Sequence, residues 1–509
     1  MFNGGYDTAI ESVSSAGRGG WWPLAIGMAA SLVAVLGSWV PSYWSDEVAT
    51  LRASRLSWPE LFAFVGHKDA VHASYYSIMK IWLGAFGESE LATRSLSALA
   101  VGAAAAGVVV LARSLSGPRV GIAAGAVFAL LPRTTYMGIE TRSFALSATV
   151  AVWATVLFVV AARTRSWWSW VFYAALVTAG TYLFLYSVLM LAVHAVVLTR
   201  SHPTIPALRS WAIAAGTAVL ASLPLLVVSV TQKEQIAWLS DQPVVNVWTI
   251  LVEPAFDSSW LVAAIALMAL IVLVARRRAL RARGDNALLS LAVSWAVLPV
   301  AILLIADKAI GPLYTARYLS FTVPGLAILL ALVFTSTPRH GVTWALIAAL
   351  ALAAFPTYLA QRGPYAKNGG SDLSQIADYI HRHAAPGDAI YLQDTGSVTH
   401  RPRQALYAYP QEFDGVGDIA FLEPFTTTGT FSDETVAWPD VGPELVGVDR
   451  VWVVMAGASL ADASTVLLPL GFEEQLPYET NRSVIALYEK APPLTADGCR
   501  PSCGRRATG

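Results

Sequence analysis

Cysteine is scarce in this sequence, and so is charge. Only 2 of the 509 residues are cysteines, and both lie near the C-terminus, at Cys499 and Cys503. Two cysteines exclude a disulfide framework and a cysteine-based metal site. They could pair with each other if the tail is extracytoplasmic, and two unpaired thiols are the alternative. Charged residues make up 13% of the chain, whereas a soluble globular protein has about 25%. The deficit predicts a membrane protein.

Several familiar functional signatures are also missing. The 34 basic and 34 acidic residues cancel, so the charge balance does not indicate a nucleic-acid partner. There is no G-x-G-x-x-G motif, no P-loop and no internal repeat of solenoid length. His67, His72 and the scattered carboxylates lack the spacing of a metal site. The sequence therefore predicts no metal ligands and no certain cofactor, and it leaves the need for a divalent cation open.

Long apolar runs fill residues 20–360. The chain is 55% hydrophobic, with a mean hydropathy of +0.54, and about 20 apolar residues are enough to cross a bilayer as a helix. Segments of about this length occur at 22–40, 92–112, 119–135, 143–162, 167–183, 185–199, 210–230, 259–275, 288–306, 319–335 and 341–359. We therefore predict a polytopic α-helical membrane protein with about 11 transmembrane helices in a domain over residues 21–360.

The charges of the loops predict an orientation. Cytoplasmic loops of membrane proteins are enriched in Lys and Arg. Alternate loops here hold Arg113, Arg119, Arg163, Arg165, Arg200, Arg209, Arg276, Arg277, Arg278, Arg281, Arg283 and Arg339. We therefore expect a multi-pass plasma (inner) membrane protein whose N-terminus, residues 1–20, is cytoplasmic. Because eleven spans are an odd number, the C-terminal domain is expected to be extracytoplasmic.

The last 150 residues have the composition of a water-exposed domain. Residues 361–370 contain Gly363, Pro364, Gly369 and Gly370, and they are predicted to be a linker. The following pattern is α/β over residues 371–490, with a helix at 372–383 and strands at 389–393 and 451–455. Residues 491–509 are expected to form a disordered tail.

An acidic pair, Asp46 and Glu47, follows the first apolar segment on the predicted outer side. A carboxylate can act as a general base that deprotonates a hydroxyl group. The outer membrane surface is where the phosphate of a lipid-linked substrate would lie. The alternative is structural, because Ser45, Asp46 and Glu47 are also typical of a helix N-terminus.

Three further polar stretches lie at predicted outer span ends. They contain Asp69, His72 and Tyr76; then Glu140 and Arg142; and then Lys308, Arg317 and Tyr318. Ionisable side chains at such positions are unfavourable unless they are paired or functional. With Lys233, the outer cations break the positive-inside pattern, and a phosphate-bearing substrate on that side would explain them. Loop solvation and local ion pairs are the alternative.

These stretches, in this order, resemble the GT-C superfamily of integral membrane glycosyltransferases. The most similar group is the dolichyl-phosphate-mannose protein mannosyltransferases, with their bacterial polyprenyl-phosphate-sugar relatives. The matching segments are Trp44-Ser45-Asp46-Glu47, His72-Ala73-Ser74-Tyr75-Tyr76, Phe86-Gly87-Glu88-Ser89-Glu90-Leu91-Ala92-Thr93-Arg94, Glu140-Thr141-Arg142-Ser143-Phe144-Ala145-Leu146 and Ala316-Arg317-Tyr318-Leu319. The sequence departs from the family where Ala73, Ser74 and Ser143 replace prolines, and where Asp69 lies one residue further from His72 than usual.

The resemblance implies transfer of a sugar, mannose or another, from a polyprenyl-phosphate donor to a cell-envelope acceptor on the outer face, with inversion at the anomeric carbon. It implies Asp46 as the general base. It implies donor-phosphate contacts from Arg142, Arg317 and Lys308, and sugar or acceptor contacts from Glu47, Asp69, His72, Tyr76, Glu140 and Tyr318. The acceptor class stays open between lipid, glycan and protein, so protein glycosylation is one of several expected roles.

Two other functions fit part of the pattern. A transporter or flippase of lipid-linked sugars would also need outer cations, but such proteins usually contain internal repeats, and none is found here. A non-catalytic envelope-assembly subunit would use the outer α/β domain to bind a ligand.

Overall fold

A computed structural model describes residues 20–164, 166–201, 203–232, 239, 245–457, 460–475 and 477–491. The predicted cytoplasmic N-terminus up to residue 19, Lys233 and the tail with Cys499 and Cys503 lie outside the described residues. The chain divides into two compact units. The first holds the chain up to Val40 together with Leu56–Arg362, and the second holds Pro41–Arg55 together with the chain from Gly363 onward.

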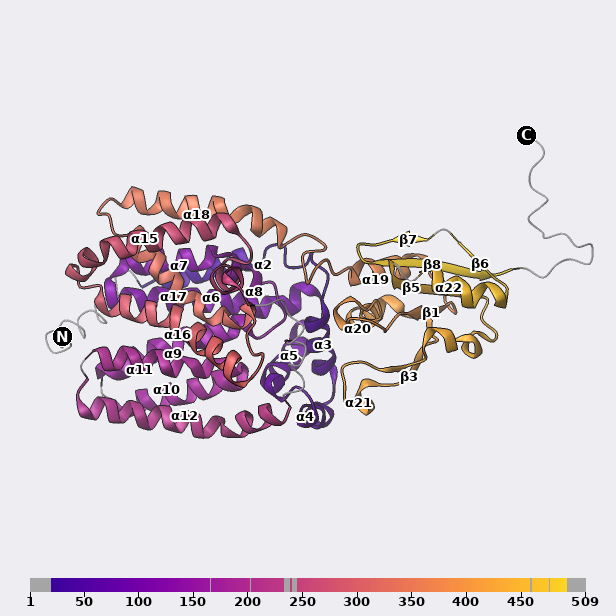
Figure 1. Cartoon of the computed structure of the whole chain (residues 1–509), viewed down its shortest axis with the longest axis horizontal. Coiled ribbons are helices and arrows are strands. Elements are labelled where there is room, and N and C mark those ends of the chain that lie inside the picture. The colour runs from indigo at the N-terminus through magenta and orange to yellow at the C-terminus, as the bar shows by residue number, and fades with distance from the viewer. Residues whose placement is uncertain are drawn as a thin grey trace, which may run out of the picture. The chain divides into compact units, whose positions relative to one another are not determined.

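The described residues of the first unit form helices and connecting turns (Figure 1). The α-helices are α2 (Trp22–Val35), α4 (Trp58–His67), α5 (Ala73–Phe86), α6 (Glu90–Ser116), α7 (Pro118–Leu130), α8 (Pro132–Met137), α9 (Phe144–Thr164), α10 (Trp167–Leu183), α11 (Met190–Arg200), α12 (Ile205–Thr231), α13 (Val247–Leu251), α14 (Glu253–Phe256), α15 (Trp260–Ala282), α16 (Asn286–Ile310), α17 (Val323–Phe334) and α18 (His340–Ala360). Short 3₁₀ helices occupy Ala70–His72, Leu185–Leu189 and Ala316–Thr322.

Each of the eleven predicted apolar segments contains a helix of the structure. Seven of these stretches are long and apolar enough to cross a membrane, namely Glu90–Ser116, Phe144–Thr164, Ile205–Thr231, Trp260–Leu280, Asn286–Ile310, Ala316–Phe334 and His340–Ala360. Three shorter apolar helices cover Trp22–Val35, Pro118–Leu130 and Leu185–Arg200. The polytopic helical architecture is confirmed, and a total of eleven crossings stays a prediction.

Small residues let the central helices approach one another closely. The helix α6 is capped by the preceding residue, Ser89, whose side chain accepts a hydrogen bond from the backbone N–H of Ala92 at 3.2 Å. Along its length α6 packs against α2, α7 and α9. At Gly102, a Cβ atom would lie 2.0 Å from the Ser31 hydroxyl and 2.5 Å from the carbonyl oxygen of Gly27. Close backbone approach at small residues is typical of helices packed in a membrane.

The second unit contains the helix α3 (Ser45–Arg55) and an α/β domain. The helices of that domain are α19 (Leu373–His383), α20 (Gln404–Ala408), α21 (Phe425–Thr428) and α22 (Leu460–Leu467). Its strands are β1 (Ala389–Leu392), β2 (Gly417–Asp418), β3 (Phe421–Glu423), β4 (Glu434–Thr435), β5 (Arg450–Ala456), β6 (Phe472–Glu474), β7 (Tyr478–Glu479) and β8 (Ser483–Lys490). The predicted C-terminal α/β domain is confirmed, and Figure 1 shows its sheet in yellow and orange.

The main sheet has the strand order β2-β1-β5-β8-β6, with β7 also paired to β8. The strands β2 and β5 run parallel to β1, whereas β8 runs antiparallel to β5. Side chains of β5 alternate between the two faces, as strand geometry requires. Val451 and Val453 lie in one core cluster with Leu467 of α22, whereas Trp452 contacts Tyr379 of α19 with ring centroids 6.1 Å apart. Helices therefore cover both faces of the sheet.

The segment 41–55 belongs to the second unit, although the sequence analysis had placed it in the membrane domain. The start of this segment is held by hydrogen bonds to residues more than 300 positions away in the sequence. The Ser42 N–H donates to the Pro364 carbonyl oxygen at 3.1 Å, and the Ser371 hydroxyl donates to the Tyr43 carbonyl oxygen at 2.6 Å. The predicted linker is also compact, because the side chain of Lys367 within it is fully buried.

Candidate functional site

The acidic pair occupies the first turn of α3. Glu47 is fully buried, and Asp46 is partly buried. Carboxylates are stabilised at a helix N-terminus by the helix dipole, and the cations Arg52 and Arg55 in the last turn complement its other end. The pair therefore has the helix-start position that the structural alternative predicts. That position also leaves Asp46 the less buried of the two carboxylates.

A second group of predicted site residues forms a chain of contacts in the first unit. The Tyr76 hydroxyl donates a hydrogen bond to Oδ2 of Asp69. The other oxygen, Oδ1, lies 3.9 Å from Nε2 of His72. That same nitrogen lies 3.1 Å from Nη2 of Arg142, which is 70 positions away in the sequence. The structure thus brings together four of the predicted residues from two separate stretches.

The protonation of His72 follows from its neighbours. A guanidinium group can only donate hydrogen bonds, so Nε2 of His72 accepts from Arg142 and carries no proton. The 3.9 Å separation from Asp69 is too long for a hydrogen bond. His72 is therefore assigned as a neutral imidazole with its proton on Nδ1.

Asp69 and Tyr76 are held in a strained but specific arrangement. Asp69 has φ +64°, in the left-handed region that aspartate tolerates better than most residues. It precedes the 3₁₀ turn Ala70–His72, which leads into α5 with Tyr76 in its first turn. Burial raises the pKa of Tyr76 well above its usual value, and the negative charge of Asp69 raises it further. Tyr76 therefore stays a neutral hydroxyl that donates to Asp69.

Glu140 and Arg142 lie in a buried turn before α9. Glu140 is 1% exposed and Arg142 is 7% exposed. The Ser97 hydroxyl of α6 donates to the Glu140 backbone carbonyl at 2.6 Å, which fixes the turn. Arg94, one turn earlier on α6, is fully buried and donates to the Ser38 carbonyl at 2.7 Å. Buried charge next to apolar helices is unfavourable without partners or function.

Arg133 is a buried cation that contacts the segment of the predicted site residue Arg317, and the sequence pattern did not single it out. It is 5% exposed, and its Nε donates to the Ser320 hydroxyl at 2.8 Å. Its Nη2 donates to the backbone carbonyl of Arg317 at 3.3 Å. Arg133 thereby fixes the 3₁₀ helix that carries Arg317. The available signal was an arginine near the predicted outer end of the apolar segment 119–135.

Tyr318 lies beside Arg317 within an aromatic cluster. Its ring centroid is 5.4 Å from that of Tyr186, 5.8 Å from Phe184 and 6.3 Å from Phe144. The guanidinium carbon of Arg317 lies 5.8 Å from the Tyr318 ring. Phe144 and Phe184 are buried in the helical core, and Tyr186 and Tyr318 pack against it, so the aromatic cluster fixes the position of the segment that carries Arg317.

Lys308 lies apart from these groups. It is exposed in the last turn of α16. Its neighbour Asp307 accepts hydrogen bonds from the backbone N–H groups of Leu313 and Tyr314, both at 2.8 Å. No contact brings Lys308 to Arg142 or Arg317 within the part of the chain that the structure describes. A phosphate contact from Lys308 stays a prediction.

Among the described residues, no three His, Cys, Asp or Glu side chains lie close enough together to hold a metal ion. The contacts of Asp69 and His72 instead go to Tyr76 and Arg142. The arrangement can therefore bind an anion through a guanidinium group.

The chain resembles solved structures of a known fold. No protein-family model and no curated protein match it. Two crystal structures of ArnT from Cupriavidus metallidurans, one apo and one bound to undecaprenyl phosphate, align with a TM-score of 0.55 and 14% identity. Each alignment covers 92% of this chain, with 97% and 98% of the ArnT chains. The chain therefore shares the fold of ArnT, which is the GT-C fold that the sequence predicts.

The predicted GT-C fold is thus confirmed along nearly the whole chain. The similarity also extends to the oligosaccharyltransferase of Archaeoglobus fulgidus, tethered with an acceptor peptide, at a TM-score of 0.44 and 12% identity. That alignment covers 91% of this chain and 74% of the other. Because the GT-C fold can be shared without sharing a substrate, the residues must carry the argument on function.

Proposed function

We propose that this protein transfers a sugar from a polyprenyl-phosphate donor to an acceptor at the outer face of the membrane. The observation that carries the proposal is the contact chain Tyr76–Asp69–His72–Arg142. It joins two polar stretches at predicted outer span ends and presents a buried guanidinium group. The likeness to ArnT, which has been crystallised with undecaprenyl phosphate, supports a polyprenyl-phosphate substrate.

The proposed reaction needs one base and one anion site. Asp46 takes the proton of the acceptor hydroxyl, and the acceptor oxygen attacks the anomeric carbon of the donor sugar. The bond between that carbon and the phosphate oxygen breaks, and polyprenyl phosphate leaves with the electron pair. Attack opposite the leaving group inverts the anomeric configuration. No redox partner is needed.

The remaining predicted residues have supporting roles in this proposal. Arg142 and Arg317 neutralise the leaving phosphate, because guanidinium groups bind phosphate oxygens in a bidentate way. Asp69, His72 and Tyr76 fix the position of Arg142. Glu47, Glu140 and Tyr318 contact the sugar or the acceptor, and Lys308 contributes an outer positive charge. Mannose as the transferred sugar and a protein as the acceptor are more specific expectations within this proposal.

A panel of radiolabelled polyprenyl-phosphate sugars tests the proposal. The purified protein is placed in liposomes with a membrane extract as acceptor, and labelled product and donor lipid in each leaflet are followed. Transfer from one donor identifies the sugar and supports the proposal. Movement of intact donor lipid between leaflets, with no product from any donor, would replace it with the transporter function.

A further inference from the structure

Asp46 lies on one side of the helix α3, and Arg52 and Arg55 lie on the other. An α-helix turns about 100° and rises about 1.5 Å per residue. Arg52 therefore projects about 120° away from Asp46 around the axis, and Arg55 about 180° away. Arg52 lies about 9 Å and Arg55 about 13.5 Å further along the axis than Asp46, so neither side chain is placed to contact the Asp46 carboxylate from the other side of the helix. At this separation a positive charge can still act on Asp46 through space, so a substitution that keeps the charge isolates the effect that Arg52 has through the orientation of α3.

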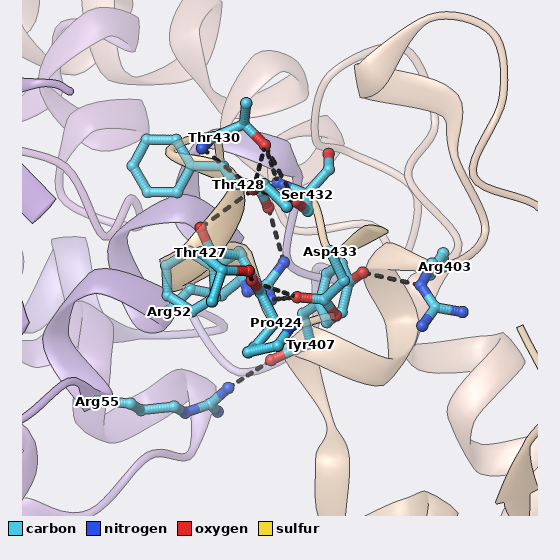
Figure 2. A network of polar contacts seen from close by, with 12 residues as sticks. Arg52, Arg55, Arg403, Tyr407, Pro424, Thr427, Thr428, Thr430, Ser432 and Asp433 are labelled. Atoms are coloured by element: carbon cyan, nitrogen blue, oxygen red, sulfur yellow. Dashed lines mark hydrogen bonds and ion pairs between the residues drawn. The ribbon is translucent and has the colours of Figure 1, made fainter. Parts of the chain in front are cut away.

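Arg52 anchors α3 to the loop 424–433 of the same unit (Figure 2). Its Nη2 lies 2.5 Å from Oδ1 of Asp433, and its Nη1 donates to the Phe431 carbonyl oxygen at 2.6 Å. The guanidinium carbon lies 3.6 Å from the ring centroid of Tyr407 and 4.1 Å from that of Phe425. Both charged side chains are buried, with 8% exposure for Arg52 and 7% for Asp433.

Hydrogen bonds between its own residues stabilise the loop 424–433. It connects the paired strands β3 and β4, and Asp433 Oδ1 also accepts the backbone N–H of Phe425 at 2.8 Å. The hydroxyl groups of Thr428 and Thr430 both donate to the Ser432 carbonyl at 3.0 Å. Figure 2 shows these threonines and Ser432 gathered on one side of Arg52. These hydrogen bonds hold the loop in one conformation. Its contacts with Arg52 therefore also hold α3 in one orientation.

A second anchor lies one turn further along α3. Arg55 donates to the backbone carbonyl oxygen of Tyr407 and, at 3.4 Å, to that of Ala408. Arg403 donates from Nε to the Tyr407 hydroxyl at 2.8 Å, which holds the ring that covers Arg52. The side of α3 away from Asp46 is therefore attached at several points to the α/β domain.

We propose that Arg52 is a positioning residue for Asp46: its contacts with Asp433 and the Tyr407 and Phe425 rings set the orientation of α3. This inference rests on the proposed function, because it concerns the chemical step that Asp46 would perform. The α/β domain then has a direct part in the reaction through α3.

A lysine at position 52 is the most informative change. It keeps the positive charge but cannot form two planar hydrogen bonds while stacking between two rings. If Arg52 positions the base, Arg52→Lys lowers kcat by roughly tenfold to a hundredfold, since misplacement by about 1 Å has that effect. The KM for the donor changes by less than about threefold, because the proposed phosphate contacts are intact. Asp433→Asn gives the same pattern.

The double variant Arg52→Lys/Asp433→Asn tests whether the two residues act as one unit. The effects of substitutions at two residues that contact each other are not additive. The double variant is therefore expected to lose no more activity than the less active of the two single variants. Arg450→Lys is the control, at an arginine that is 38% exposed and pairs with a buried aspartate. It alters another Arg–Asp pair of the same unit, Arg450–Asp388 at 3.1 Å, in the sheet rather than on α3. The control is expected to keep its wild-type kcat.

Each outcome decides the inference. An Arg52→Lys protein that melts as the wild type does and keeps its kcat would overturn it. An equal loss of kcat in Arg450→Lys would also overturn it, because general loosening of the domain would then explain both. Failure of the proposed function is distinguishable, because in that case the wild-type protein transfers no sugar at all.

Discussion

At the scale of single residues, Asp69 combines three requirements. Its backbone is left-handed, its Oδ2 accepts the Tyr76 hydroxyl, and its charge lies near His72. An asparagine meets the first two requirements and removes only the charge. An alanine meets none. Comparing these two variants separates the structural role of the side chain from its electrostatic role.

Asp69→Ala is expected to lower the free energy of unfolding by about 2 kcal/mol or more. The left-handed backbone becomes unfavourable by about 1–2 kcal/mol, and the buried Tyr76 hydroxyl loses its acceptor at about 1–3 kcal/mol. Asp69→Asn is expected to stay within about 1 kcal/mol of the wild type. Thermal unfolding of the detergent-solubilised protein measures both. Equal loss in the two variants would show that the charge, rather than the geometry, holds the turn.

At the scale of elements, the close crossing of α2 and α6 depends on glycine. A Cβ atom at Gly102 would meet the Ser31 hydroxyl and the Gly27 carbonyl at 2.0 and 2.5 Å, so the helices would have to separate. The backbone of Gly27 cannot move independently of α2. By contrast, a Cβ atom at Gly216 on α12 would meet nothing within 4 Å.

Gly102→Ala is expected to destabilise the first unit by about 1–3 kcal/mol, the usual effect of overpacking. Gly216→Ala is the control, and it should be neutral or slightly stabilising because alanine favours helix. Thermal midpoints in detergent distinguish the two. A Gly102→Ala protein as stable as the wild type would show that α2 and α6 do not need this close approach.

At the scale of the whole molecule, the sequence was most informative where local pattern decides structure. Apolar runs predicted a helix at each of eleven segments, and short apolar runs predicted strands at 389–393 and 451–455. The position of residues 41–55 could not be predicted, because it depends on partners such as Asp433 and Pro364 that have no local signature. Arg133 was missed for the same reason, since its partners Arg317 and Ser320 lie more than 180 positions away.

The candidate site was predicted unevenly. Asp69, His72 and Tyr76 are close together in the sequence, so they could be predicted as one group. Arg142 joins them only through a tertiary contact, which sequence spacing does not reveal. The charge of Lys308 is the only feature that marks it in the sequence, and this residue lies exposed at a helix end. Charge marks candidates, whereas only tertiary contacts show which of them act together.

The predicted orientation of the whole molecule is testable by labelling. Because the arginine-rich loops are expected inside, Arg278→Cys should resist a membrane-impermeant thiol reagent in intact cells. Asp378→Cys should be labelled, because this residue of α19 is 61% exposed in the domain expected outside. Both variants carry Cys499→Ser and Cys503→Ser. The reverse labelling pattern would invert the orientation and contradict transfer at the outer face.

The most direct test of the account is a single-turnover assay of wild-type and Asp46→Asn protein with the donor identified by the panel. Sugar transferred and polyprenyl phosphate released are counted together. Asp378→Asn, an exposed acid of the same unit, is the control. We predict one phosphate released per sugar transferred in the wild type and the control, and a loss of about a hundredfold or more in Asp46→Asn. Wild-type transfer by correctly inserted Asp46→Asn protein would contradict the assignment of the base.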